Sequence, residues 1–435
     1  MRFKRCVVCS ERPFDMTESD SAESLCIFTI VARNYLPLAL TLADSVQRHH
    51  PQSPLRIFVV DGLSGLPEPA SQHRLIDATT YLGAEFEELR FKYNITEFCT
   101  SIKPHLFQRL FAETEADLVY YLDPDTWLFG RLEAIHQPAP QAAMFLTPHL
   151  LHCRPALDHA YPEYKHLWEG IFNLGFCAAR RGEPSKLFLD WWDKRLREHC
   201  YADHFDGLHT DQKWMDYAPA YLGDALSIVR LQGVNVAHWN LDERTLQTTV
   251  DGFTVNGEPL LLFHFSGFDF NGTCLTRHVE PERQAPYLSR SVLELAAQYR
   301  QAVRANGYEA HISLPYRFNS FDNGQAVTAL HRRLYRALGG LRFSATPFDT
   351  QAPLYQRLAQ RRLLDNSAAA LRSHAASTLP GIGRLTRVAE ALLGGFLRLF
   401  GARRYAYLMK FFNKYAKPEN HVFLVQPRPD SDETR

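Results

Sequence analysis

The sequence lacks a net charge, because its 48 basic and 48 acidic side chains cancel over 435 residues. This balance removes any global electrostatic argument for a nucleic-acid partner, and we expect none. Long apolar runs are absent as well. No stretch reaches the length of a membrane-spanning helix, and the N-terminus MRFKRCVVCS lacks the apolar core of a signal peptide. These absences predict a cytoplasmic protein.

Cysteines are scarce, with eight scattered through the whole chain. Cys6 and Cys9 form a single CxxC motif, but no second cysteine or histidine pair follows at zinc-site spacing. A structural zinc site is therefore disfavoured. The scattered positions favour reduced thiols that pack as small apolar groups.

Hydrophobic residues are abundant, at 46% of the chain, and they are arranged in alternating patterns. Apolar runs at 25–32, 56–61 and 118–122 are typical of buried strands, whereas 34–50 and 101–115 carry apolar residues at helical spacing. The segment 71–80 also has a helical pattern. Strands that alternate with helices predict an α/β fold with a mainly parallel sheet covered by helices on both faces.

Two carboxylates stand where the third of these strands ends, in the sequence LVYYLDPDTWLF. Asp123 and Asp125 are separated by one residue, so in an extended chain their side chains point to the same side and converge on one cation. A solvated turn is the ordinary alternative for such a tripeptide. The end of a buried strand, however, is where open α/β sheets form their ligand crevice.

Further polar groups follow along the chain. The strand pattern IFNLGFCAARR at 171–181 precedes a helix, and the polar stretch 204–219 is dense in aspartate and histidine. Asn256-Gly257 predicts a hairpin, and the apolar strand after it ends in His264. A lone histidine of this kind is more often structural than functional.

Five of these motifs, taken in order, resemble a known family. The chain is similar to nucleotide-sugar-dependent glycosyltransferases of the GT-A fold, most like family 8, which includes glycogenin and bacterial lipopolysaccharide galactosyltransferases. The resemblance covers about residues 25 to 280. It rests on Ala32-Arg33-Asn34-Tyr35, Asp123-Pro124-Asp125, Phe172 to Phe176, Asp211-Gln212 and His264-Phe265-Ser266-Gly267.

The resemblance implies a metal-dependent enzyme that transfers a sugar from a nucleotide-sugar, expected to be a UDP-sugar. Asp123, Asp125 and His264 would hold Mn²⁺ or Mg²⁺, which stabilises the charge on the departing diphosphate. Donor contacts would come from six positions. These are Ala32, Asn34, Tyr35, Lys103, Asp123 and Gly267.

For the reacting sugar, the resemblance implies catalytic roles for Asn173, Asp211 and Gln212. Asp211 is expected to position the sugar and stabilise charge, with retention of the anomeric configuration. Its alternative is a helix N-cap, and the alternative for Lys103 is a solvated helix lysine. The acceptor would be a glycan, a lipid-linked molecule or a protein.

One position departs from the family pattern. Phe270 stands three residues after Gly267, where the family commonly has a lysine that grips the diphosphate. Arg277, on the following loop, is the candidate replacement. Two other functions stay open: a sugar-1-phosphate nucleotidyltransferase, disfavoured because VARNYLPL lacks a glycine-rich phosphate loop, and a non-catalytic binding protein with a decayed transferase fold.

The predicted organisation has three parts: a flexible lead-in at 1–24, a GT-A catalytic domain at 25–280 and a mainly helical extension at 281–435. Within the extension, 381–417 interleaves basic and apolar residues, a pattern of helices that lie on anionic membranes. Three glycines, Gly394, Gly395 and Gly401, are expected to break this helix. The alternatives are a peripheral contact at the inner face of the membrane and a helical hairpin with a basic outer face.

Overall fold

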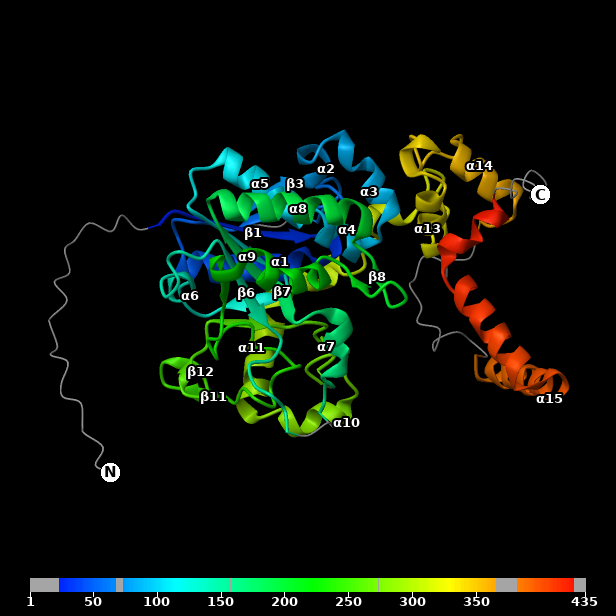
Figure 1. Cartoon of the computed structure of the whole chain (residues 1–435). Helices are drawn as coiled ribbons and strands as arrows, with labels where there is room; N and C mark the ends of the chain where they lie inside the picture. Colours follow the sequence, from blue (N-terminus) through cyan, green and yellow to red (C-terminus); the bar gives the residue numbers. More distant parts are fainter. Residues whose placement is uncertain (1–22, 68–72, 156–158, 273, 365–381, 426–435) are drawn as a thin grey trace, which may run out of the picture.

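A computed structural model describes residues 23–67, 73–155, 159–272, 274–364 and 382–425. Its centre is a seven-stranded sheet with the strand order β10-β6-β7-β4-β1-β2-β3 (Figure 1). Every strand is parallel to the others except β7, which runs antiparallel to both of its neighbours. The strands are β1 Leu25–Val31, β2 Arg56–Val59, β3 Arg74–Asp77, β4 Leu118–Leu122, β6 Met144–Pro148, β7 Phe172–Arg180 and β10 Leu226–Ile228.

Helices cover both faces of this sheet, which explains why its strands are apolar without alternation. On one face, α4 (Ile95–Ser101), α5 (Lys103–Glu113) and α8 (Glu183–His199) pack against side chains such as Phe28 and Phe58. On the other face, α1 (Leu36–His49) packs against Ile27 and Ile57. The α/β fold with a mainly parallel sheet and a helical C-terminal region, predicted from the sequence, is confirmed.

A smaller lobe lies below the main sheet in Figure 1. Its strand β5 (Thr126–Leu128) follows the two aspartates and pairs with β14 (Leu262–His264). The helix α11 (Arg290–Ala305) packs on this pair, and the rings of Phe265 and Tyr299 stack 3.7 Å apart. The lobe therefore fixes the chain on both sides of the candidate site.

Two local predictions had different outcomes. Asn256-Gly257 forms the expected turn, with both residues at positive φ, between β12 (Gly252–Val255) and β13 (Glu258–Pro259). The helical prediction for 71–80 was wrong over 74–77, because these residues pair with β2 as strand β3, and helix α2 (Ala78–Tyr81) starts only after them. Residues 71 and 72 lie outside the described part of the chain.

The remaining elements of the first 312 residues are short. They are β8 Ala202–Asp203, β9 Leu208–His209, β11 Leu246–Thr249, α3 Glu87–Lys92, α6 Glu133–His136, α7 Tyr164–Glu169, α9 Ala218–Leu222, α10 Pro281–Gln284 and α12 Tyr308–His311. They join the larger elements.

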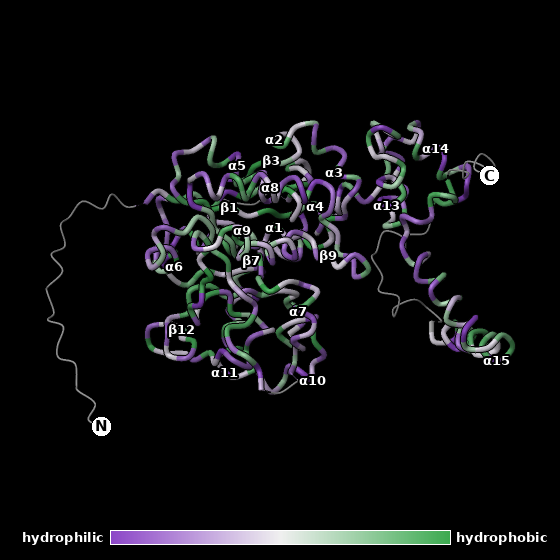
Figure 2. Tube along the Cα trace, viewed as in Figure 1, coloured by the Kyte–Doolittle hydropathy of each residue, from purple (hydrophilic) through white to green (hydrophobic). Residues whose placement is uncertain are grey.

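The C-terminal region forms a separate helical group at one side of the sheet (Figure 1). Helices α13 (Ala329–Ala337) and α14 (Pro353–Gln360) share an apolar cluster with Phe91 and with Val425. Between them and Val425 in the chain runs α15 (Ile382–Tyr415), whose side chains are exposed or half-buried. Figure 2 shows hydrophobic residues both inside the sheet and along α15.

Glycines break α15 at one point only. Gly401 has φ 79° and interrupts the helix, whereas Gly394 and Gly395 lie within it. The expectation of three breaks was therefore wrong at two positions, since a glycine weakens a helix without forcing it to end. No helix in the described ranges has the length and apolarity needed to cross a membrane.

Candidate active site

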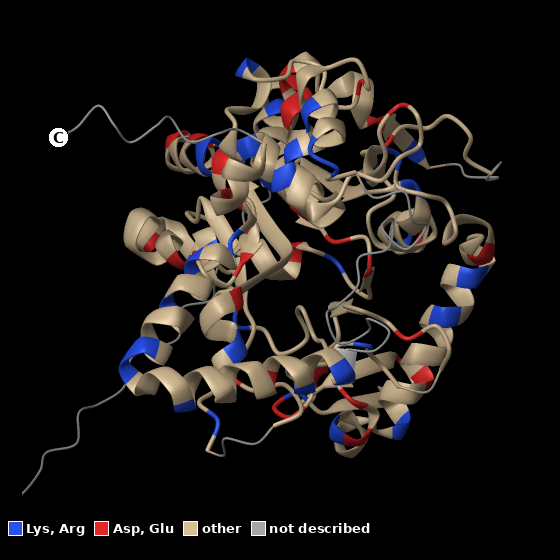
Figure 3. Cartoon of the chain, turned by 90° about the vertical axis from the view of Figure 1, so that its right-hand side faces the viewer, with Lys and Arg blue, Asp and Glu red and all other residues tan. Residues whose placement is uncertain are grey.

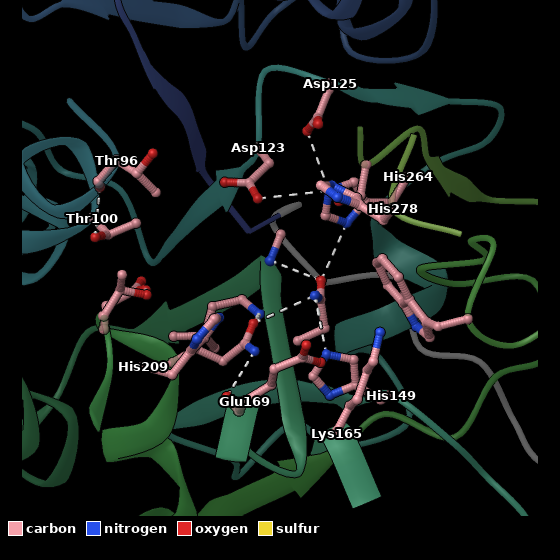
Figure 4. Close-up of a pocket in the computed structure, with 18 of the residues that line it drawn as sticks. Thr96, Thr100, Asp123, Asp125, His149, Lys165, Glu169, His209, His264 and His278 are labelled. Carbon is pink, nitrogen blue, oxygen red and sulfur yellow. Dashed lines mark hydrogen bonds and ion pairs between the residues drawn. The ribbon is translucent and has the colours of Figure 1, made fainter. Parts of the chain in front are cut away.

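The Asp123-Pro124-Asp125 turn leaves the carboxyl end of β4 and immediately enters β5. Thr126 closes the turn, since its backbone N–H and its hydroxyl both donate to the Asp123 carbonyl, at 3.0 and 2.7 Å. The register of β5 with β14 places His264 opposite Thr126. The strand pairing of the small lobe therefore brings His264 to the two carboxylates (Figure 4).

The three side chains form a compact cluster of two oxygens and one nitrogen. Nε2 of His264 lies 3.2 Å from Oδ1 of Asp125 and 3.7 Å from Oδ2 of Asp123. Ligand atoms of all three residues lie within 4.8 Å of one another, a spacing that suits one metal ion. The structure thus brings together the three predicted metal ligands.

The surroundings shift the pKa values of the three side chains in different directions. Burial raises the pKa of Asp123 above its usual value. Burial also acts to raise the pKa of Asp125, but the facing His264 imidazole outweighs it and holds that pKa below its usual value. For His264, burial favours the neutral form, yet the Asp125 carboxylate dominates and raises the pKa. The cluster attracts a cation, whether a proton or a metal.

Two asparagines fix which nitrogen of His264 faces the aspartates. Nδ1 lies 3.2 Å from Oδ1 of Asn173 and 3.2 Å from Oδ1 of Asn235. Amide oxygens only accept hydrogen bonds, so Nδ1 carries the proton and donates. In the neutral ring the lone pair then belongs to Nε2, which faces the carboxylates, as a metal ligand requires.

Gly175, within β7, makes room for this histidine. A Cβ atom at Gly175 would lie 2.3 Å from Cε1 and 2.4 Å from Nδ1 of His264. The backbone N–H of Gly175 also donates to Oδ1 of Asn173 at 3.0 Å, which sets the orientation of that amide. The FNLGF segment therefore acts as the support on which His264 rests. Asn173, predicted to be catalytic, lies in the site and positions His264.

Lys103 and Asp211 form a buried ion pair beside the cluster. Nζ of Lys103 lies 2.5 Å from Oδ2 of Asp211, with both side chains 3% exposed or less. Nζ also donates to the Leu174 carbonyl and lies 4.0 Å from the centre of the Tyr121 ring. Burial disfavours the ammonium form, but Asp211 and then Asp123 outweigh it and raise the pKa of Lys103. The alternative of a solvated lysine is wrong.

Asp211 stands at the start of a 3-10 helix, Gln212–Tyr217, but its side chain makes no capping hydrogen bond, so the N-cap alternative also fails. Trp192 donates to the Asp211 carbonyl at 3.2 Å, and the preceding Thr210 has a strained φ of 46°. Gln212 accepts from the Leu174 N–H at 3.0 Å and donates to the Glu169 carbonyl at 2.9 Å. These contacts hold the predicted Asp211-Gln212 pair against β7.

Two cavities meet at the aspartates. One, of about 340 Å³, is lined by Ala32, Asn34 and Tyr35. The other, of about 440 Å³, is lined by Lys103, Asn173, Asp211, Gln212 and His264. Thr96, Thr100, Asp123 and Asp125 line both. Among the described residues, the buried Oδ1 of Asn34 has no hydrogen-bond partner, so it is a polar group that a ligand would satisfy.

Three positions of the sequence prediction, Gly267, Phe270 and Arg277, lie outside these linings. Gly267 is absent from both cavity walls, but it directly adjoins Ser266, which lines the larger one. Phe270 points elsewhere, because its ring stacks 3.9 Å from that of Tyr308 in the small lobe. The predicted donor contacts therefore converge except at Gly267.

The sequence analysis missed several residues of the larger cavity, half of those named below being histidines. Burial lowers the pKa of His149 to about 3 and that of His238 well below its usual value, so both are neutral. Neutral imidazoles offer a donor and an acceptor, which suits sugar hydroxyls. His149 directly follows the carboxyl end of β6. Open α/β sheets form their ligand crevice at the carboxyl ends of their strands, so the argument used for Asp123 could also have found His149. The missed residues are His149, Tyr161, Lys165, Glu169, His209, His238, Trp239 and His278.

A second group of potential metal ligands consists of His149 and Glu169, which line the larger cavity, and His166 next to them. The two imidazole rings are stacked, with centroids 4.4 Å apart and planes inclined by 26°. Lone pairs lie in the ring planes, so two nearly parallel stacked rings do not direct them at one ion. This group forms part of the cavity wall.

No family model matches the chain. It is similar to two uncharacterised proteins of Bacillus subtilis (strain 168). YfnF is 24% identical over 246 residues, which are 55% of this chain and 80% of YfnF. YfnD is 24% identical over 251 residues, which are 55% of this chain and 76% of YfnD.

Similar solved structures include the galactosyltransferase LgtC in complex with donor and acceptor sugar analogues. It shares 14% identity, covers 64% of this chain and 95% of LgtC, and has a TM-score of 0.36. A glycosyltransferase involved in glycosylation of the major capsid of PBCV-1 shares 10% identity, over 61% of this chain and 98% of its own, with a TM-score of 0.34. Mouse xyloside xylosyltransferase 1 shares 12% sequence identity. The match covers 56% of this chain and 97% of the mouse protein, with a TM-score of 0.34.

All three of these proteins are glycosyltransferases. TM-scores and identities this low carry no functional assignment. The function must be argued from the site itself.

Proposed function

We propose that this protein is a metal-dependent glycosyltransferase that moves a sugar from a nucleotide-sugar, specifically a UDP-sugar, to a glycan, lipid-linked or protein acceptor. The observation that carries the proposal is the orientation of His264: its Nδ1 faces two asparagine oxygens, and its Nε2 faces Asp123 and Asp125. Nothing in a solvated turn requires that arrangement. A metal site does.

Asp123, Asp125 and His264 would hold Mn²⁺ or Mg²⁺, and the set of two carboxylates and one imidazole favours manganese. When bound, such an ion acts as a Lewis acid on the diphosphate leaving group. The smaller cavity would take the nucleoside, with the unpartnered Oδ1 of Asn34 accepting a hydrogen bond from it. Ala32 and Tyr35 would form the rest of that pocket.

The sugar would lie in the larger cavity beside the Lys103–Asp211 pair. Because Asp211 is already paired with a buried cation, it is suited to orienting the sugar and balancing developing charge. Gln212 and Asn173 would shape the floor from β7. Transfer with retention of configuration stays a prediction of the sequence resemblance. The domain boundaries at 24 and 280 and the cytoplasmic location stay predictions of the sequence.

We also propose that α15 binds an anionic lipid surface, which would bring the enzyme to lipid-linked acceptors. Its basic side chains stand along an exposed helix (Figure 3), together with exposed apolar residues such as Leu392, Leu399 and Phe411. Its sequence has seven basic residues and one acidic residue, Glu390. Cosedimentation with anionic and with neutral vesicles tests this: equal binding to both, or none, would contradict it.

The central test is a screen of donor hydrolysis. The purified protein is incubated with Mn²⁺ and UDP-, GDP- or TDP-sugars, and the released nucleoside diphosphate is measured with and without EDTA. We expect metal-dependent release from one UDP-sugar, and NMR of the released sugar reports its anomeric configuration. Absence of both turnover and binding for every donor would eliminate the proposal.

A further inference from the structure

Position 270 cannot supply a cation to the site. The Phe270 ring stacks on Tyr308 and meets the Phe268 ring edge-on at 4.9 Å, within the apolar cluster of the small lobe. The side chain therefore points away from both cavities. If a diphosphate binds here, its positive partner must come from another segment.

The segment 274–279 returns alongside the turn that carries Gly267. Residues 268 and 276 form a β-bridge, and the Thr276 hydroxyl donates to the Ser266 carbonyl at 2.8 Å. The buried Gln284 ties the segment down from behind: its side chain accepts from the N–H of Leu275 and donates to the carbonyl of Val279. The backbone of this segment is therefore held in place before any ligand arrives.

Within this segment, His278 lines the larger cavity, and the exposed Arg277 contacts Gly267 and Tyr35 at the edge of the site. His278 lines the larger cavity, and its ring lies directly on Gly267, where a Cβ atom would be 2.3 Å from Nε2 of His278. Figure 4 shows His278 next to His264 and Asp125. The two rings thus form one continuous wall.

Arg277 lies between the two cavities. Its backbone N–H and its Nε both donate to the Gly267 carbonyl, at 2.9 and 3.3 Å. Its Nη2 lies 3.5 Å from the hydroxyl of Tyr35, which lines the smaller cavity. Within the described ranges, the guanidinium has no carboxylate partner, so its charge is available to a ligand.

We propose that Arg277, with His278 beside it, grips the diphosphate of the nucleotide-sugar in place of the lysine missing at position 270. This inference rests on the proposed function. A ligand whose nucleoside occupies the Tyr35 cavity and whose phosphates reach Asp123 and Asp125 would lie beside Tyr35, whose hydroxyl Arg277 contacts. A guanidinium matches two phosphate oxygens at once, whereas the lysine it replaces offers one point charge.

Isothermal titration of UDP and of uridine, each with Mn²⁺, tests this grip on the full chain. Arg277→Gln is expected to weaken UDP binding about ten- to hundredfold while leaving uridine binding unchanged, because only UDP carries the diphosphate. Arg277→Lys should restore part of the affinity. Arg361→Gln, an exposed arginine on the C-terminal helices, serves as the matched control and should bind UDP as the wild type does.

A second variant tests whether Lys165, another cation of the site, binds the diphosphate instead of Arg277. Lys165 lines the larger cavity, so Lys165→Gln is measured in parallel. Loss of UDP affinity in Lys165→Gln but not in Arg277→Gln would overturn the inference and leave the proposed function standing. Equal loss of UDP and uridine binding in Arg277→Gln would also overturn it, as this would indicate a damaged pocket. A wild type that binds neither ligand would overturn both proposals.

Discussion

The pocket around Asp123 and the helix α15 differ in whether their charged side chains are buried or exposed. In the pocket, charged side chains are buried and face a partner, as Lys103 faces Asp211 and His264 faces Asp125. On α15, basic side chains such as Arg404 are exposed and stand among exposed apolar ones such as Phe400. In the first arrangement, charged side chains pair with one another inside the chain. In the second, basic and apolar side chains are exposed along one helix.

This difference indicates in which region a single substitution should have a large effect on stability or binding. A buried charge depends on one neighbour, so removing that neighbour leaves a large uncompensated cost. An exposed basic helix shares its attraction over many residues, so each contributes little. The predictions below proceed from the strongest expected effect in the pocket to the weakest on α15.

Asp125→Asn should lower sugar-nucleotide turnover by at least about a thousandfold, because an amide oxygen cannot replace a carboxylate in holding the metal. The side chain is 19% exposed at a strand end, so the fold should persist, with an unchanged circular dichroism spectrum. Steady-state assays with saturating Mn²⁺ measure the effect. Full activity in this variant would place the metal elsewhere.

Lys103→Met should destabilise the protein by about 3 kcal/mol or more, because Asp211 would stay buried without its partner. Urea unfolding measures the loss. Adding Asp211→Asn in the same chain should recover part of it, since the unpaired charge is then removed. A single variant as stable as the wild type would show that the pair is not buried as described.

Gly175→Ala should reduce Mn²⁺ affinity about ten- to hundredfold, since the added methyl group displaces His264 from its asparagine partners. Gly182→Ala provides the control, because its nearest neighbour would be 3.8 Å away. Both affinities are measured by titration calorimetry. Identical affinities would mean that His264 is free to move without cost.

Arg404→Gln on α15 should weaken binding to anionic vesicles only about fivefold, the share of one charge near the surface. Unfolding by urea should be unchanged, since this side chain is exposed. Loss of all vesicle binding in this single variant would contradict the claim that many basic residues share the attraction. Helix α15 would then depend on one charge, as the pocket does.

The sequence allowed the carboxylate pair and its strand to be predicted, because a buried parallel strand and its carboxyl end leave a local pattern. His264 was predictable only through the family resemblance, since its approach to Asp125 depends on the pairing of β5 with β14 across more than a hundred residues.

Other features left no local signal. The burial of Lys103 depends on how α5 packs against β7, and the role of Asn173 depends on a histidine far away in the chain. The histidine-rich cavity wall was missed for the same reason. In contrast, the departure at Phe270 could be read directly, because a single residue type excludes a charge.

The most direct measurement is a titration of Mn²⁺ into the wild type and into Asp125→Asn, followed by electron paramagnetic resonance of free Mn²⁺. If Asp123, Asp125 and His264 form the metal site, the wild type binds one Mn²⁺ per chain and Asp125→Asn binds it far more weakly. Equal binding by the two proteins, or no binding by the wild type, would contradict the account.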